Sequence, residues 1–129
     1  DRRIKEALQL DNIEDECGHS QVLHFQDDKP IQLEYRWVNS EVVPEYAEQD
    51  FSQITPSEYL SSIAPVTEAE HSVEAIIGTE SVRDLLELDT DEAILLLERK
   101  TWCNGKLVSY AKLYHPGNRY RLGTKFKTS

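Results

Sequence analysis

The sequence predicts an α+β protein in which helices cover an antiparallel β-sheet. The dipeptide Asn104-Gly105 separates two apolar-rich runs, and it is the strongest short signal of a hairpin because a tight I′ turn needs two residues that tolerate positive φ. Strand-like segments outnumber helix-like segments, and most of them are joined by tight turns. Only a few short segments carry helix signals, so the helices are expected to cover the sheet and not to form a bundle.

The N-terminal part of the chain is expected to hold a helix and a hairpin, followed by an irregular connection. Arg2 to Leu10 places its apolar residues on one helical face. Ser20 to Phe25 and Ile31 to Val38 are rich in strand-forming residues and flank the polar turn Gln26 to Lys29. Asn39 to Ile54 is polar and acidic, which is typical of a loop.

The rest of the chain is expected to hold two capped helices and four strands. In Thr55 to Glu58, threonine is the N-cap, proline takes the first helical position and glutamate completes a capping box, so a helix begins here and ends before Pro65. Glu70 to Ile77 alternates as a strand, and Thr79 caps a second helix. The stripe of that helix expected to be buried is Val82, Leu85 and Leu86. The remaining strands are expected at Ala93 to Cys103, Lys106 to Tyr114 and Arg119 to Lys127.

Length and composition limit the possible functions. At 129 residues the chain is expected to form one domain. Its formal net charge is -10, from 24 acidic and 14 basic residues, whereas duplex DNA binding needs clustered Lys and Arg, so the chain is not expected to bind DNA by itself. Cys17 and Cys103 are too few for a disulfide framework or a zinc site, and no apolar run approaches the roughly 20 residues of a membrane span. Cytoplasmic residence without a metal, a cofactor or a membrane partner is expected.

The closing hairpin predicts which side chains share a face of the sheet. With a two-residue loop, Cys103 opposes Lys106, and opposed residues lie on the same face. Ser109 and His115 are then on one face, and Tyr110 is on the other. The residues of the preceding strand expected on the face of Ser109 are Ile94, Leu96, Glu98, Lys100 and Trp102.

The first hairpin has two possible registers. A three-residue loop, Gln26 to Asp28, with Asp28 left-handed would put His24 on the face of Glu34 and Arg36. A two-residue loop would point His24 away from Glu34. We favour the three-residue loop because aspartate tolerates the left-handed position.

Several polar residues are candidates for a binding site. Arg36 could match a ligand carboxylate with its planar fork, and Glu34 could accept a hydrogen bond from a ring N–H. Alternatively, the two form only a structural ion pair. His24 and His115 have no carboxylate or cysteine at ligand spacing, which favours hydrogen-bonded sheet residues over metal ligands. There is no nucleophile elbow and no glycine-rich phosphate loop, so nothing indicates catalysis.

Four ordered segments resemble the UTRA (effector-binding) domain of GntR-type repressors, and within it the HutC branch of histidine-utilisation repressors. They are HFQDDKPIQLEYRWVN (24–39), ITPSEYL (54–60), APVTEAEHSVEA (64–75) and HPGNRYRL (115–122). The resemblance implies a chorismate-lyase-like fold and a homodimer. It also implies a winged helix that binds operator DNA, which this chain is expected to lack. Effector binding is expected to shift the population between dimer arrangements.

The resemblance also implies a pocket and an effector. The effector-binding residues carried over by position are His24, Glu34, Ser109 and His115, with Arg36 and Tyr110 as additions. Relatives that bind sugar phosphates have basic residues where Val22 and His24 stand and glutamate where Ser109 stands, so a phosphosugar is not expected. The HutC branch implies urocanate, an imidazole acrylate. The alternative is a small enzyme on a chorismate-lyase-like scaffold, which would need positioned bases and an arginine pair that the sequence does not reveal.

Overall fold

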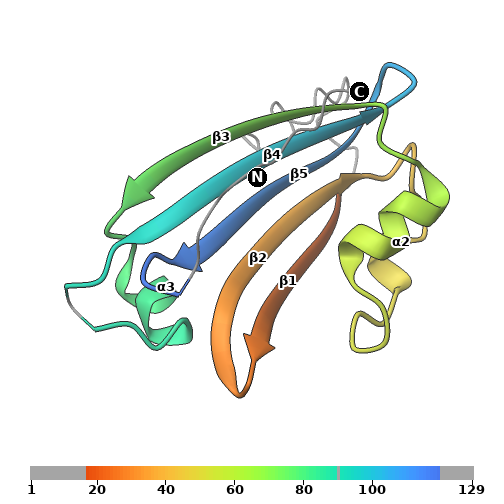
Figure 1. Ribbon diagram of the computed structural model, residues 1–129. Coiled ribbons are helices and arrows are strands. Elements are labelled where there is room, and N and C mark those ends of the chain that lie inside the picture. Colours follow the sequence, from red (N-terminus) through yellow and green to blue (C-terminus); the bar gives the residue numbers. More distant parts are fainter. Residues whose placement is uncertain (1–16, 90, 120–129) are drawn as a thin grey trace, which may run out of the picture.

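The structure is a computed structural model that describes residues 17–89 and 91–119 (Figure 1). Within these residues, five strands form one antiparallel sheet in the order β1-β2-β5-β4-β3. The strands are β1 (Cys17–Gln26), β2 (Lys29–Asn39), β3 (Glu68–Ile76), β4 (Ile94–Cys103) and β5 (Lys106–Pro116). The helical elements are η1 (Tyr46–Glu48), α2 (Pro56–Ile63) and α3 (Glu80–Leu85). The predicted α+β class is confirmed, whereas the helix predicted at residues 2–10 and the strand predicted after Arg119 lie outside the described residues.

Local signals place the helices and the second hairpin as predicted. Thr55 Oγ1 accepts a hydrogen bond from the Glu58 backbone N–H at 3.1 Å, which caps α2. Thr79 caps α3 in the same way. Asn104 and Gly105 have φ of 50° and 84°, as the I′ turn between β4 and β5 requires. None of the helices among the described residues is long and apolar enough to cross a membrane.

The turn of the first hairpin differs from the one we favoured. Gln26 pairs with Lys29, and Asp27 and Asp28 have φ of 51° and 64°. The loop therefore has two residues in I′ geometry, and the three-residue prediction is wrong. Two consecutive aspartates take the role that Asn-Gly plays in the second hairpin, since a short polar side chain tolerates the left-handed region.

A β-bulge in β2 nevertheless brings His24 to the face predicted for it. Ile31 is an extra residue in β2, so His24 opposes Gln32. Residues two apart on a strand share a face, and His24 therefore lies on the same face as Glu34. The combination of a shorter loop and a bulge gives the same facing as the longer loop.

A second bulge changes the facing predicted for β4. Val108 is an extra residue in β5, so Ser109 pairs with Thr101 and not with Lys100. Arg99 and Thr101 consequently lie on the face of Ser109, and Lys100 lies on the other. The facing predicted for Ile94, Leu96, Glu98, Lys100 and Trp102 is wrong. The bulge shifts by one residue the position of β4 that opposes Ser109, and successive residues of β4 lie on opposite faces.

Each face of the sheet carries its own helix and core. The face that bears Arg36 and Ser109, here called the α2 face, packs on α2 and η1 through Val38, Val43, Tyr46, Leu60, Ala64 and Val108. The opposite face, the α3 face, packs on α3 through Leu33, Val82, Leu86 and Ile94. Burial of Val82 and Leu86 is confirmed, but Leu85 is 38% exposed and the prediction for it is wrong. Polar candidates on the α2 face can therefore lie under a helix.

Candidate functional site

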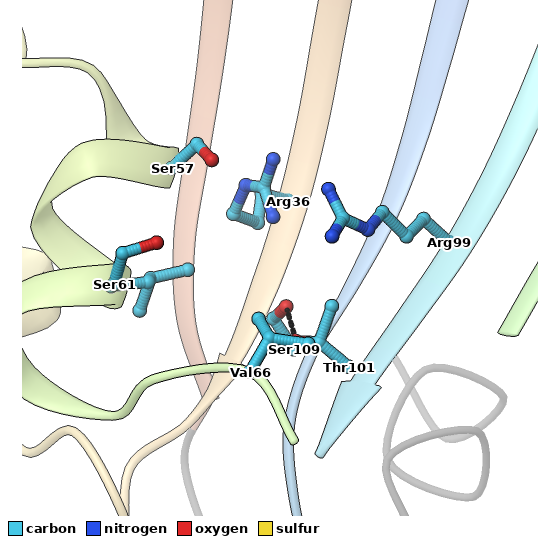
Figure 2. Close-up of a pocket in the computed structure, with 8 residues that line it drawn as sticks. Arg36, Ser57, Ser61, Val66, Arg99, Thr101 and Ser109 are labelled. Atoms are coloured by element: carbon cyan, nitrogen blue, oxygen red, sulfur yellow. Dashed lines mark hydrogen bonds between the residues drawn. The ribbon is translucent and has the colours of Figure 1, made fainter. Parts of the chain in front are cut away.

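Two arginines flank a small residue in the middle of the α2 face. Arg36 of β2 and Arg99 of β4 both pair with Ala111 of β5. Since neighbouring strands lie about 4.8 Å apart, the two arginine backbones are separated by roughly 10 Å. Figure 2 shows Arg99 reaching from β4 across β5 towards Arg36 on β2. This arginine pair was not visible in the sequence, because only the bulge at Val108 turns Arg99 to this face.

A pocket lies between this arginine pair and α2. Its cavity volume is about 30 Å³, and it opens into a wider region of about 280 Å³ that includes solvent. Its polar lining consists of Arg36, Arg99, Ser57, Ser61, Thr101 and Ser109, and Leu60 and Val66 complete it. Ser57 and Ser61 are four residues apart on α2 and therefore project from one side of the helix. Two cations and four hydroxyl groups thus converge on one space.

Glu34 holds Arg36 from within the same strand. Arg36 Nε donates to Glu34 Oε2 at 2.8 Å, and His24 Nε2 contacts Oε1 at 2.9 Å. Glu34 and Arg36 are 3% and 5% exposed. Burial would raise the pKa of Glu34, but the hydrogen bond from His24 and the charge and hydrogen bond of Arg36 outweigh it and hold that pKa below its ordinary value. Glu34 is therefore an ionised carboxylate that fixes both neighbours.

Arg99 has no such partner. Its Nε is buried and makes no hydrogen bond, and no salt bridge to it is found among the described residues. Burial lowers the pKa of Arg99, and the nearby charge of Arg36 lowers it further. Among the residues that the structure describes, no carboxylate therefore compensates this positive charge of the pocket.

Ser109 and Thr101 form the adjacent row. Their hydroxyl oxygens lie 2.7 Å apart, and both residues are buried (Figure 2). One hydroxyl donates to the other, so the accepting hydroxyl keeps its own hydrogen for a further acceptor. The pair can therefore offer one donor to a ligand.

His115 is tied into the sheet. Its ring is fully buried, with Nε2 2.9 Å from the side-chain nitrogen of Gln32 and Nδ1 3.3 Å from the carbonyl oxygen of Leu95. Because the amide nitrogen donates, Nε2 accepts and Nδ1 carries the proton. Burial lowers the pKa of His115, which agrees with a neutral ring. His115 does not line the pocket.

Tyr110 lies on the α3 face. Its ring packs 5.8 Å from that of Trp37, and Lys100 Nζ lies 6.0 Å from its centroid. The structure thus brings Arg36 and Ser109 into the pocket, with Glu34 and His24 bonded beside it. It does not bring Tyr110 to them. The pocket residues missed in the sequence are Arg99, Thr101, Ser57 and Ser61. For the two serines, the capping box together with their four-residue spacing was an available signal.

The same fold is found in a domain of known function from a bacterial transcription regulator. The effector-binding domain of the Bacillus subtilis trehalose repressor has a TM-score of 0.82 at 16% identity, covering all of this chain and 90% of that one, which shows the fold alone. Residues 1–121 match the UTRA domain family, and the chain belongs to that family.

Relatives of 43–45% sequence identity are named histidine utilization repressors. The repressor of Pseudomonas aeruginosa is 43% identical over 123 residues, which cover 95% of this chain and 49% of that protein, and that of Klebsiella aerogenes is 45% identical over 108 residues, covering 84% and 45%. The crystal structure of the C-terminal domain of the Pseudomonas syringae repressor matches with a TM-score of 0.86 at 45% identity, covering 96% of this chain and 89% of that one. The chain spans about half the length of the full repressors. The resemblance to this branch is confirmed, and the regulatory interpretation is confirmed over the enzymatic one.

Proposed function

We propose that this chain is the effector-sensing and dimerisation domain of a repressor of histidine-utilisation genes, and that urocanate is the effector. The observation that carries the proposal is the line of charges on the α2 face. Arg36 presents a cation to the pocket, and Glu34 lies two residues before it on β2. Urocanate carries a carboxylate at one end and an imidazole at the other, so its two ends require those two kinds of group.

Glu34 has room for one more hydrogen bond. Its two oxygens already accept from His24 and Arg36, but each carboxylate oxygen can accept twice. An imidazole N–H of the effector would take one of the remaining positions. His24 and Arg36 hold the carboxylate in place, which reduces the entropy lost on binding.

The regulatory step belongs to the longer protein. In the proposed mechanism two copies associate, and urocanate binds one arrangement of the dimer more tightly than the other. A ligand shifts an equilibrium only through such a difference in affinity. The favoured arrangement would misalign the DNA-binding halves with the operator half-sites. A regulator of this kind acts on the chromosome, so cytoplasmic residence is part of the proposal.

Isothermal titration of the purified chain with urocanate, histidine and glucosamine 6-phosphate tests the effector. We expect saturable binding of urocanate, no binding of the phosphosugar and no turnover of urocanate by absorbance. Glu34→Gln should weaken urocanate binding, whereas the exposed Glu74→Gln on β3 should not. Sedimentation equilibrium tests the dimer. A folded, dimeric protein that does not respond to urocanate would refute the effector.

A further inference from the structure

We infer that the pocket under α2 binds a singly charged carboxylate between Arg36 and Arg99, and that Arg99 sets this specificity. The inference rests on the proposed function only in assigning that carboxylate to the effector. The binding group itself follows from the space between the two arginines, their charges and the donors around them.

Ala111 makes the space between the arginines. It is fully buried and lies directly between Arg36 and Arg99 in the sheet. A larger side chain at this position would project into the gap between the two guanidinium groups. Ser57 and Ser61 of α2 line the same pocket and lie on the side of Arg36 (Figure 2). The gap therefore has arginines on two sides and a small residue between them in the sheet, and the serine hydroxyl groups of α2 line the same pocket.

The net charge of Arg36, Arg99 and Glu34 is +1, so one negative charge on the ligand would neutralise it. Glu34 compensates Arg36 through a hydrogen bond of 2.8 Å, whereas Arg99 has a buried Nε without a partner. Buried polar groups are ordinarily hydrogen-bonded, and an unpaired one indicates a missing partner. A carboxylate would pair with Arg99 in the planar geometry that guanidinium groups favour. A phosphate dianion would bring a second charge, and no further cation is found among the described residues that line the pocket.

Within the sheet, the donors that line the pocket come from the two arginines and from the neighbouring pair Thr101 and Ser109. On the other side of Ala111, Leu113 pairs with Glu34 and with Leu97. Both leucines are buried and apolar on this face. An anion displaced in that direction would lose its donors and approach the Glu34 carboxylate. The negative group is therefore held at Arg99, and the rest of the ligand is left to extend towards Glu34.

Titration of the wild type, Arg99→Gln and Arg99→Lys with urocanate and with its neutral amide tests the inference. We expect the wild type to prefer urocanate to the amide by at least about tenfold, the scale of one charge-assisted hydrogen bond. Arg99→Gln should lose that preference, and Arg99→Lys should keep part of it. Lys100→Gln, on the α3 face, should keep all of it. An unchanged preference in Arg99→Gln would overturn the inference.

Loss of folding does not confound this variant. Within the described part of the chain Arg99 has no hydrogen-bonding partner at Nε and no salt bridge, and it lies near another cation. Thermal unfolding of unliganded Arg99→Gln is therefore expected at or above the wild-type midpoint. A clearly lower midpoint would show that Arg99 has a structural role and would count against the inference.

A second measurement separates this inference from the proposed effector. If the wild type ignores urocanate, the effector is wrong, but the carboxylate site can still be tested with sodium acetate against sodium chloride at equal ionic strength. We expect acetate to raise the midpoint of thermal unfolding more in the wild type than in Arg99→Gln, because a ligand stabilises the state that binds it. An equal response of both proteins would overturn the carboxylate site.

Discussion

Arg36 donates from Nε to Glu34 Oε2 at 2.8 Å, two positions away on the same strand. Because residues two apart share a face of a sheet, the contact needs no other element to form it. It occupies the Nε of Arg36 and leaves its two terminal nitrogens to face the pocket. The two interpretations of this pair, a structural ion pair and a ligand site, are therefore compatible, since the ion pair fixes the guanidinium that a ligand would meet.

The Glu34 carboxylate should make the fold sensitive to acid. Its pKa is lowered in the folded state, so its contribution to stability is complete above the ordinary value of 4.5 and is lost as the pH falls through the lower folded value. Glu34→Gln should cost about 3 kcal/mol near neutral pH, because buried Arg36 loses its counterion. It should also flatten the decline below pH 4.5. Urea unfolding as a function of pH measures both effects, with exposed Glu74→Gln as the control. A parallel decline in Glu34→Gln and wild type would contradict this expectation.

His115 should matter first for stability. The ring is fully buried and hydrogen-bonded to Gln32 and to the carbonyl of Leu95. His115→Ala should therefore destabilise the protein by about 2–4 kcal/mol through the cavity and the lost hydrogen bonds. The resemblance implies instead that His115 binds the effector, in which case this change would weaken binding and leave the fold intact. Denaturant unfolding decides between the two expectations, with exposed His71→Ala as the control, and an unchanged midpoint would refute the structural role.

The same burial should make the stability of the protein depend on pH through His115. A histidine paired with a carboxylate has a raised pKa, whereas that of buried His115 is lowered. Burial lowers the pKa of His115 in the folded state, so the unfolded chain binds the proton more readily. Stability should therefore fall as the pH drops below the ordinary value of 6.5. The thermal midpoint should decrease as the pH falls from 6.5 in the wild type and less so in His115→Gln. Equal slopes would show that another group titrates in this range.

Much of the fold could be predicted because its signals are local. The caps at Thr55 and Thr79 and the turn at Asn104-Gly105 each depend on a few adjacent residues. The two bulges could not be predicted in this way, since an extra residue at Ile31 or Val108 is fixed by how whole strands pack. The bulge at Ile31 places His24 on the face of Glu34 despite the shorter loop. The bulge at Val108 places Arg99 on the α2 face, where the sequence did not predict it.

The residues that carried the resemblance are partly structural. Arg119 of the HPGNRYRL segment donates to the backbone carbonyls of Pro30 and Leu86 at 3.0 and 3.1 Å. It thus joins the start of β2 to the end of α3, a contact between segments far apart in the sequence. Gly117 allows its backbone to approach that of Ala93, whose carbonyl oxygen lies 2.8 Å from where a Cβ would be. The resemblance in this segment is therefore a better indicator of the fold than of the residues that line the pocket.

Two glycines with similar backbone geometry should respond differently to the same substitution. Gly78 and Gly105 have φ of 80° and 84°. A Cβ on Gly78 would lie 2.7 Å from Ile94 Cδ1 in the core, whereas one on Gly105 would meet nothing within 4 Å. Gly105→Ala should cost about 1 kcal/mol for the left-handed conformation alone. Gly78→Ala should cost about 1–3 kcal/mol more through overpacking. Equal losses in denaturant unfolding would show that the core around Ile94 adapts freely.

Tyr110 should not contribute to effector affinity. Its ring lies on the α3 face against Trp37, and the sheet separates it from Arg36 and Arg99. Burial, reinforced by Glu98, raises the pKa of its hydroxyl, so Tyr110→Phe changes no charge at neutral pH. Isothermal titration should give the same urocanate affinity for Tyr110→Phe and wild type, while the lost hydroxyl lowers stability by about 1 kcal/mol. If Tyr110→Phe weakened urocanate binding as strongly as Arg99→Gln, the effector would have to contact the α3 face, and the pocket under α2 would not be the site.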